Sequence, residues 1–269
     1  MVWPSSRLTF PNGCSLTQPV SEIIVIKIGT GVLTRENGTL DGASLVRLVT
    51  AVSALHAAGH SCVMVSSGAV GAGVSALGLD SYPADVESRQ AAAAVGQARL
   101  MQRYQTLFEQ FDLNVAQLLL TAGDLADHHE RISATLQRLL ADSSIIPIVN
   151  ENDSVAIEEL RVGDNDMLSA RVATLLKARQ LILFTTVDGL MPPDGGDIIA
   201  EVADVQEVLT FARNESGKFS IGGMASKLKA VQLATEQGIQ VTIANGRRPE
   251  QLIELVNGSG RGTRFSAKG

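Results

Sequence analysis

Four segments of the chain combine glycine, lysine and acidic residues in patterns suited to binding anions. The first spans residues 25–31, Val-Ile-Lys-Ile-Gly-Thr-Gly, where Lys27 interrupts an otherwise apolar predicted strand. Burying a lysine costs desolvation energy unless a carboxylate or an anionic ligand pairs with it. Gly29 and Gly31 would let backbone N–H groups approach phosphate oxygens closely. Taken alone, this segment fits an edge-strand lysine before a glycine turn equally well.

The second segment, residues 66–73, places small residues between a predicted strand and a predicted helix. Its sequence is Ser-Ser-Gly-Ala-Val-Gly-Ala-Gly. A strand, a small-residue turn and a helix N-terminus together form an anion site. The glycines also partly match a dinucleotide-binding fingerprint. However, position 76 is not glycine, and no acidic residue closes the next strand to hold a ribose.

The third segment pairs Asn-Glu-Asn-Asp at residues 150–153 with Gly-Asp-Asn-Asp at residues 163–166. Asp164 alone fits a structural helix cap. Asp153, Asp164 and Asp166 together exceed what one helix N-terminus needs, and clustered carboxylates repel unless lysines, a metal or an amino group neutralise them. We therefore expect this group to hold a substrate ammonium and to orient catalytic lysines.

The fourth segment, residues 221–227, reads Ile-Gly-Gly-Met-Ala-Ser-Lys. Its glycines open a predicted helix and place Lys227 about one turn in, where the ammonium could reach β- and γ-phosphate oxygens. The G-x-x-x-x-G-K-[ST] pattern of a P-loop is absent. The structural alternative is an ordinary glycine-opened helix with a solvated lysine.

Short apolar runs alternate with helical patterns along the chain and predict the elements that position these segments. Predicted strands cover residues 23–28, 62–66, 115–120, 145–149, 181–185 and 241–244. The first predicted helix starts after the N-cap Asp41, and a last short helix follows Pro249. Between them, predicted helices cover residues 86–111 (as one helix or two), 165–179, 205–213 and 225–237.

The alternation predicts an α/β fold, a three-layer αβα sandwich with a mostly parallel central sheet. In such sheets ligands bind beyond the carboxyl ends of the strands. Pro147 removes a hydrogen-bond donor, which predicts an edge or irregular strand at 145–149. We expect residues 1–20 to form a loosely ordered N-terminal extension and residues 21–269 to form the catalytic domain.

Composition excludes several classes of protein. The net charge is −6 and the basic residues are dispersed, so nucleic acid is not an expected partner. No apolar run approaches the roughly 20 residues that span a bilayer, and no membrane association is expected. Two cysteines, Cys14 and Cys62, cannot build a disulfide framework, which favours a cytoplasmic location.

From about Glu22 to Phe265 the chain resembles the amino acid kinase family, most closely its glutamate 5-kinase branch. Acetylglutamate, carbamate and nucleoside-monophosphate kinases of similar fold use other residues in place of the paired Asn-Glu-Asn-Asp and Gly-Asp-Asn-Asp. The matching stretches are Val-Ile-Lys-Ile-Gly-Thr, Ser-Ser-Gly-Ala-Val, Ala-Ala-Val-Gly-Gln, Gln-Leu-Leu-Leu-Thr, Pro-Ile-Val-Asn-Glu-Asn-Asp, Val-Gly-Asp-Asn-Asp-Met-Leu-Ser-Ala and Gly-Gly-Met-Ala-Ser-Lys.

The resemblance implies transfer of the ATP γ-phosphoryl group to the side-chain carboxylate of L-glutamate, giving L-glutamyl 5-phosphate, the first step of proline biosynthesis. It implies Mg²⁺ held mainly by the nucleotide phosphates rather than by protein ligands. It also implies a homodimer or homotetramer and proline as a feedback inhibitor.

The resemblance also implies that Lys27 and Lys227 stabilise the transferring phosphoryl group and that Asp166 holds both lysines in position. The residues implied to bind glutamate are Ser67, Gly68, Asp153 and Asn165. Those implied to bind the nucleotide are Lys27, Gly29, Thr185, Thr186, Ile221, Gly222, Gly223, Met224, Ala225, Ser226 and Lys227.

The chain departs from the family pattern on the nucleotide side, at Gly31, Thr186, Met191, Ile221 and Ala225. We expect altered nucleotide contacts rather than loss of activity. Two alternatives stay open: a kinase of the same fold acting on another small acid, such as acetylglutamate or carbamate, and a catalytically silent metabolite sensor. The PUA domain that follows the kinase domain in many members is not expected in this chain.

Overall fold

The computed structural model describes residues 21–155, 165–193, 195–211 and 223–268. The predicted extension and the site candidates Asp164, Ile221 and Gly222 lie outside these ranges. Eight strands form one sheet in the order β3-β4-β2-β1-β5-β7-β8-β6. The strands are β1 Ile23–Ile28, β2 Ser61–Ser66, β3 Asn114–Leu120, β4 Ile145–Glu151, β5 Gln180–Thr185, β6 Glu201–Val202, β7 Gln240–Asn245 and β8 Gly262–Phe265.

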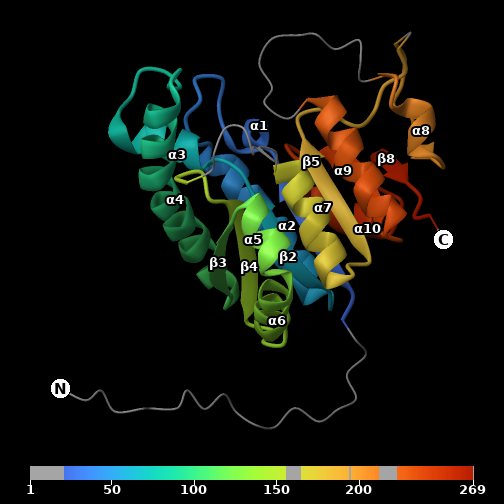
Figure 1. Ribbon diagram of the computed structural model, residues 1–269, viewed down its shortest axis with the longest axis horizontal. Coiled ribbons are helices and arrows are strands. Elements are labelled where there is room, and N and C mark those ends of the chain that lie inside the picture. Colours follow the sequence, from blue (N-terminus) through green and yellow to red (C-terminus); the bar gives the residue numbers. More distant parts are fainter. Residues whose placement is uncertain (1–20, 156–164, 194, 212–222, 269) are drawn as a thin grey trace.

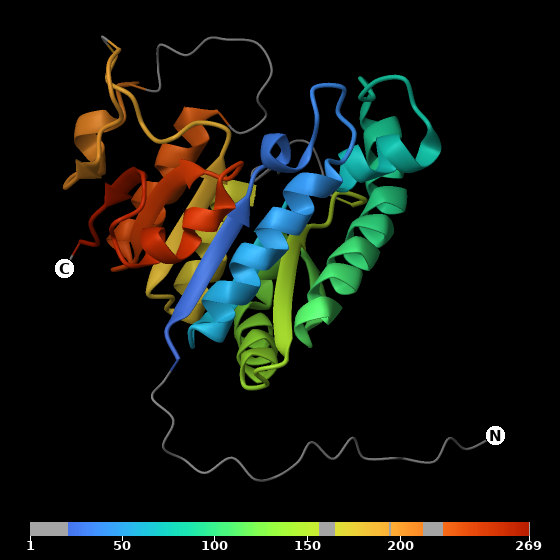
Figure 2. The ribbon, with the colours of Figure 1, turned by 180° about the vertical axis from the view of Figure 1, so that it is seen from behind.

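Helices cover both faces of this sheet (Figures 1 and 2), which confirms the predicted three-layer αβα fold. The α-helices are α1 Thr30–Leu33, α2 Gly42–Ala57, α3 Ala69–Leu77, α4 Val86–Phe108, α5 Ala122–Asp127, α6 His129–Leu140, α7 Asn165–Leu176, α8 Val205–Val208, α9 Met224–Glu236 and α10 Leu252–Val256. The described residues also include the 3₁₀ turns η1 Glu109–Phe111 and η4 Pro249–Gln251. In the described part of the chain, no helix has the length and apolar character needed to cross a membrane.

Alternation of side chains along β1 divides the core into two layers. Ile24, Ile26 and Ile28 pack with residues of α2, α4 and α10, whereas Val25 packs with residues of α6, α7 and α9. Because side chains two apart on a strand share a face, Lys27 points to the same side as Val25. The strand therefore directs Lys27 toward the layer that contains α7 and α9.

From β3 to β7 in the sheet order the strands are parallel, as predicted, but β8 runs antiparallel to β7.

The edge position predicted for the strand containing Pro147 is wrong, because β4 lies between β3 and β2. The β2 ladder meets β4 only at Ile148 and Val149. Pro147 precedes that ladder, so an interior strand can accommodate its missing N–H group.

Helices α3 and α4 cross with their backbones in direct contact. A Cβ atom on Gly73 would lie 1.9 Å from the Ala92 carbonyl oxygen, and one on Gly96 would lie 1.8 Å from the Ala69 carbonyl oxygen. No side chain fits at either place. The two glycines thus set how closely the helices approach.

Gly96→Ala should therefore destabilise the fold even though alanine favours helix. Overpacking of this kind typically costs about 1–3 kcal/mol, and here the methyl group would meet rigid backbone. Urea unfolding of the two proteins measures the difference. The matched control is Gly123→Ala in α5, where the nearest atom to an added Cβ is Thr121 Oγ1 at 3.7 Å. Equal midpoints for the Gly96 variant and the parent would contradict the crossing geometry.

Candidate active site

Two lysines from distant parts of the sequence share one buried carboxylate. Asp166 Oδ1 forms an ion pair with Lys27 Nζ, and Asp166 Oδ2 lies 3.1 Å from Lys227 Nζ. Asp166 is 0% exposed, Lys27 4% and Lys227 7%. Two ammonium groups and one carboxylate sum to a net charge of +1. A buried cluster with this balance is suited to receive an anion.

Each member of this lysine–aspartate cluster is placed by the start or end of an element. Lys27 is near the carboxyl end of the central strand β1. Asp166 is the second residue of α7, where the positive end of the helix dipole favours a carboxylate. Lys227 lies in the first turn of α9. Gly29 lies beside the cluster, because a Cβ there would lie 3.7 Å from Lys27 Nζ and 3.2 Å from the Phe184 carbonyl oxygen.

A chain of amide hydrogen bonds begins next to Asp166. Asn165 Nδ2 donates to Ser67 Oγ at 2.7 Å and to Asn150 Oδ1 at 2.9 Å. Asn150 Nδ2 in turn donates to Gln97 Oε1 at 3.0 Å. This relay joins α7, β2, β4 and α4. It connects the predicted Ser67 and Asn165 with Asn150, a member of the predicted ammonium-binding group, and adds Gln97, to which we gave no role of its own from sequence.

Two atoms of this relay have no hydrogen-bond partner among the described residues. Asn165 Oδ1 is a buried acceptor and Gln97 Nε2 is a buried donor. Buried polar atoms without partners are rare in folded proteins and call for an explanation. A ligand carrying both an ammonium group and a carboxylate would satisfy one atom of each kind.

The other predicted substrate residues flank this relay. Gly68, the N-cap of α3, has φ of +106°, a conformation that favours glycine, and caps the helix with no side-chain hydrogen bond. Asp153 is half-buried in the turn just after β4. Both residues therefore lie at the carboxyl ends of parallel strands, where α/β sheets bind ligands.

The predicted nucleotide residues lie at the ends of β5 and α9. Gly223 is the N-cap of α9 and offers no side-chain cap, so the first N–H groups of the helix can face an anion. Met224, Ala225 and Ser226 follow it in the first turn. Thr185 ends β5 and accepts a hydrogen bond from Gly246 N at 2.8 Å.

Gly31 and Thr186, two positions predicted to depart from the family pattern, are neighbours in space. A Cβ atom on Gly31 would lie 2.9 Å from Thr186 Cγ2. A serine at position 31 would therefore crowd the threonine that follows β5. The two changes form one steric unit rather than two independent losses.

Asp188, which our sequence analysis did not identify, ties the loop after β5 to the segments after β7. It accepts hydrogen bonds from Asn245 Nδ2 at 2.8 Å, from Arg261 Nε at 3.2 Å and from Arg248. The Arg248 hydrogen bond, with those of Asn245 and Arg261, lowers the pKa of Asp188 to about 2. Its partners lie far away in sequence, so no local pattern indicates this network.

Comparison with known proteins agrees with this geometry. Residues 22–245 match the model of the amino acid kinase family. A glutamate 5-kinase from Symbiobacterium thermophilum is 45% identical over 91% of this chain and 96% of its own length. Glutamate 5-kinase 1 from Bacillus subtilis is 41% identical over 91% of this chain and 69% of its own length.

Solved structures share the fold at low sequence identity. Carbamate kinase from Giardia lamblia bound to AMP-PNP superposes with a TM-score of 0.65 at 17% identity, covering 93% of this chain and 99% of that one. UMP kinase from Ureaplasma parvum gives 0.60 at 13% identity, covering 91% and 99%. The family match and the close relatives together establish that the chain belongs to the amino acid kinase family, in its glutamate 5-kinase branch.

Proposed function

We propose that the chain transfers the γ-phosphoryl group of ATP to the side-chain carboxylate of L-glutamate, giving L-glutamyl 5-phosphate for proline biosynthesis. The observation that carries the proposal is the pairing of Asp166 with both Lys27 and Lys227 in one buried cluster. The names of the similar proteins add the acceptor, since each is a glutamate 5-kinase at 40–45% identity.

The chemistry requires charge control more than acid–base catalysis. A carboxylate oxygen of glutamate attacks the γ-phosphorus, the bond from that phosphorus to the β–γ bridging oxygen breaks, and ADP leaves. The nucleophile is already ionised at neutral pH, so the chain need not supply a general base. The barrier lies in bringing two anions together, and positioned positive charges lower it.

Lys27 and Lys227 would contact the transferring phosphoryl group, and Asp166 would fix both ammonium groups. The uncapped start of α9 at Gly223 would hold phosphate oxygens through its N–H groups. Thr185, Thr186 and Gly29 would border the rest of the nucleotide. These roles follow from where each residue lies relative to the cluster.

Mg²⁺ fits this arrangement as a partner of the nucleotide. Both Asp166 oxygens are engaged by lysines, and the described residues hold no group of three potential metal-ligating side chains. Phosphate oxygens would therefore provide most of its coordination. When bound, the ion would neutralise charge on the phosphates.

Glutamate would be held by the amide relay and the start of α3. The N–H groups after Gly68 suit a carboxylate, and Asn165 Oδ1 together with Asp153 suits the α-ammonium. Gln97 Nε2 provides a second donor for a carboxylate. A substrate with two carboxylates and one ammonium group matches this set of donors and acceptors.

A panel assay tests the function directly. Purified protein with Mg²⁺-ATP is offered L-glutamate, N-acetyl-L-glutamate or carbamate, and ADP release and hydroxylamine-trapped acyl phosphate are measured. We expect hydroxamate with L-glutamate. ADP release with another acid alone would assign the chain to that acid, and saturable binding without turnover would make it a sensor.

Asp153→Ala should raise the glutamate KM by roughly 10- to 100-fold, the range for losing one charged hydrogen bond. The KM for ATP should change less than about threefold, because Asp153 lies beyond β4 and not beside α9. Steady-state kinetics measure both constants. Asp127→Ala, an exposed carboxylate at the end of α5, is the control. An unchanged glutamate KM in the Asp153 variant would remove this residue from the site.

We place the enzyme in the cytoplasm, a location suited to an ATP-dependent kinase with a buried free thiol at Cys62. Self-association as a homodimer or homotetramer and inhibition by proline remain predictions drawn from the family. Light scattering and proline titration of the kinase activity measure them.

A further inference from the structure

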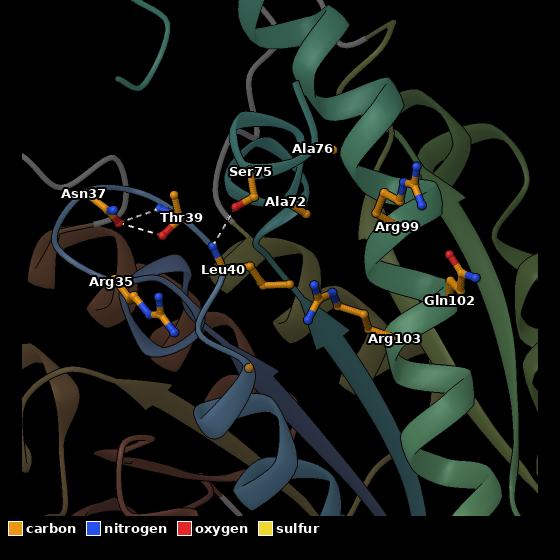
Figure 3. A pocket seen from close by; sticks show the side chains of 11 residues that line it. Arg35, Asn37, Thr39, Leu40, Ala72, Ser75, Ala76, Arg99, Gln102 and Arg103 are labelled. Atoms are coloured by element: carbon orange, nitrogen blue, oxygen red, sulfur yellow. Dashed lines mark hydrogen bonds between the residues drawn. The ribbon is translucent and has the colours of Figure 1, made fainter. Parts of the chain in front are cut away.

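A pocket of about 750 Å³ lies away from the lysine–aspartate cluster and shares no residue with it. Its walls come from the loop between α1 and α2, the start of α2, one side of α3 and one side of α4 (Figure 3). Small-molecule sites typically occupy about 300–1,000 Å³. The pocket is therefore large enough for a metabolite.

The pocket is strongly cationic. Arg35, Arg99 and Arg103 all line it. In Figure 3, Arg35 comes from the α1–α2 loop and Arg103 from α4, with the Arg103 guanidinium directed toward that loop. A Cβ on Gly42, the first residue of α2, would lie 3.8 Å from Arg103 Nη1. One guanidinium is thus held beside a helix N-terminus, where the backbone also favours negative charge.

Few acidic groups balance these arginines. Arg99 and Arg103 form no hydrogen bond or ion pair within the described ranges. They are four residues apart on α4, a spacing at which like charges repel. Asp41 lies 3.8 Å from Arg35, and its carboxylate already accepts hydrogen bonds from Ser44 and from the start of α2. Glu36 follows Arg35 in the chain but is not among the described residues that line the pocket.

The wall opposite α4 is held in position by its own hydrogen bonds. Asn37 Oδ1 accepts from Thr39 N at 3.1 Å and Thr39 Oγ1 at 2.6 Å. Leu40 N donates to Ser75 Oγ at 3.1 Å, which ties the loop to α3. A wall fixed before binding reduces the ordering that a ligand must impose.

We propose that this pocket binds a small organic polyanion, one that carries at least two phosphate or carboxylate groups. Guanidinium groups pair with both kinds of oxyanion in bidentate geometry. Arg35, Arg99 and Arg103 line the pocket and none of its described lining residues is acidic, so a monovalent anion cannot balance their charge. Ligand binding here would not depend on the phosphoryl-transfer reaction proposed above.

Calorimetric titration of the full chain, without ATP or glutamate, tests the site. Tripolyphosphate and citrate are the polyvalent probes, one for each oxyanion class, and acetate is the monovalent control. We expect at least one polyvalent probe to bind saturably and acetate not to bind. The class that binds more tightly identifies the headgroup.

The arginine variants locate the binding. Arg99→Gln/Arg103→Gln should weaken it by at least about tenfold, and Arg35→Gln, on a different element, should weaken it as well. Arg131→Gln/Arg171→Gln removes the same charge from α6 and α7 and should change the affinity less than about twofold. All are exposed or half-exposed positions, and circular dichroism checks that each variant is folded.

Three outcomes would overturn the proposal. The first is that neither polyvalent probe binds saturably, and the second is that both double arginine variants weaken binding equally. The third is that Lys227→Met abolishes binding while the pocket arginines are intact. The last result would assign the bound polyanion to the lysine–aspartate cluster. Loss of polyanion binding that is confined to the Arg35, Arg99 and Arg103 variants supports the site.

Discussion

Lys227→Ala is expected to lower kcat for glutamate phosphorylation by at least about 100-fold, the scale on which removing one transition-state charge contact acts. Lys227 Nζ is held 3.1 Å from Asp166 Oδ2 and is almost fully buried. In the proposed mechanism its ammonium would therefore reach the transferring phosphoryl group already oriented. Without it, part of the charge that develops in the transition state goes uncompensated.

The control lies on the same helix. Lys229→Ala removes an exposed lysine two residues away and should leave kcat within about twofold. Rapid-quench or coupled assays of both variants at saturating ATP and glutamate make the comparison. A Lys227 variant with activity within twofold of the parent would remove this lysine from the mechanism.

Asp166→Asn is expected to damage stability and catalysis together. The change keeps the shape of the side chain but leaves Lys27 and Lys227 buried without the carboxylate that they share. Removing one partner of a buried ion pair typically costs about 3–5 kcal/mol. Turnover should fall as well, because neither ammonium group keeps a fixed position.

Urea unfolding and steady-state kinetics separate the two effects. Asp166→Asn/Lys227→Met should recover part of the lost stability, because one buried charge is removed, but should recover no activity. Asp127→Asn, at an exposed carboxylate, should match the parent in both measurements. An Asp166 variant as stable as the parent would show that the cluster does not depend on this carboxylate.

The lysine–aspartate cluster was predictable because each of its three residues belongs to a short sequence pattern that can be recognised locally. Lys27 interrupts an apolar strand pattern, Lys227 follows a glycine pair, and Asp166 belongs to an acidic group too dense for helix capping. Parallel strands bring the segments that follow them to one edge of the sheet. Those three signals were therefore enough to predict that Lys27, Asp166 and Lys227 lie together, and their role in binding an anion stays a prediction.

The features missed from sequence depend on contacts between distant segments. Gln97 is one polar residue on an alanine-rich helix, and only the position of Asn150 gives it a role. The role of Asp188 depends on its hydrogen bonds from Asn245 at the end of β7 and from Arg261 just before β8. The edge position predicted from Pro147 was wrong because the register of β2 against β4 decides whether a backbone N–H group is needed at that position. No local sequence pattern specifies that register.

The backbone contact between α3 and α4 has a mechanical consequence. At Gly73 and Gly96 the backbones of the two helices meet with no side chain between them, so these two points cannot absorb a shift of one helix against the other. Ser67 lies just before α3, and Gln97 lies on α4 next to the crossing. We therefore expect α3 and α4 to move as one rigid unit, which would keep the positions of Ser67 and Gln97 relative to each other unchanged.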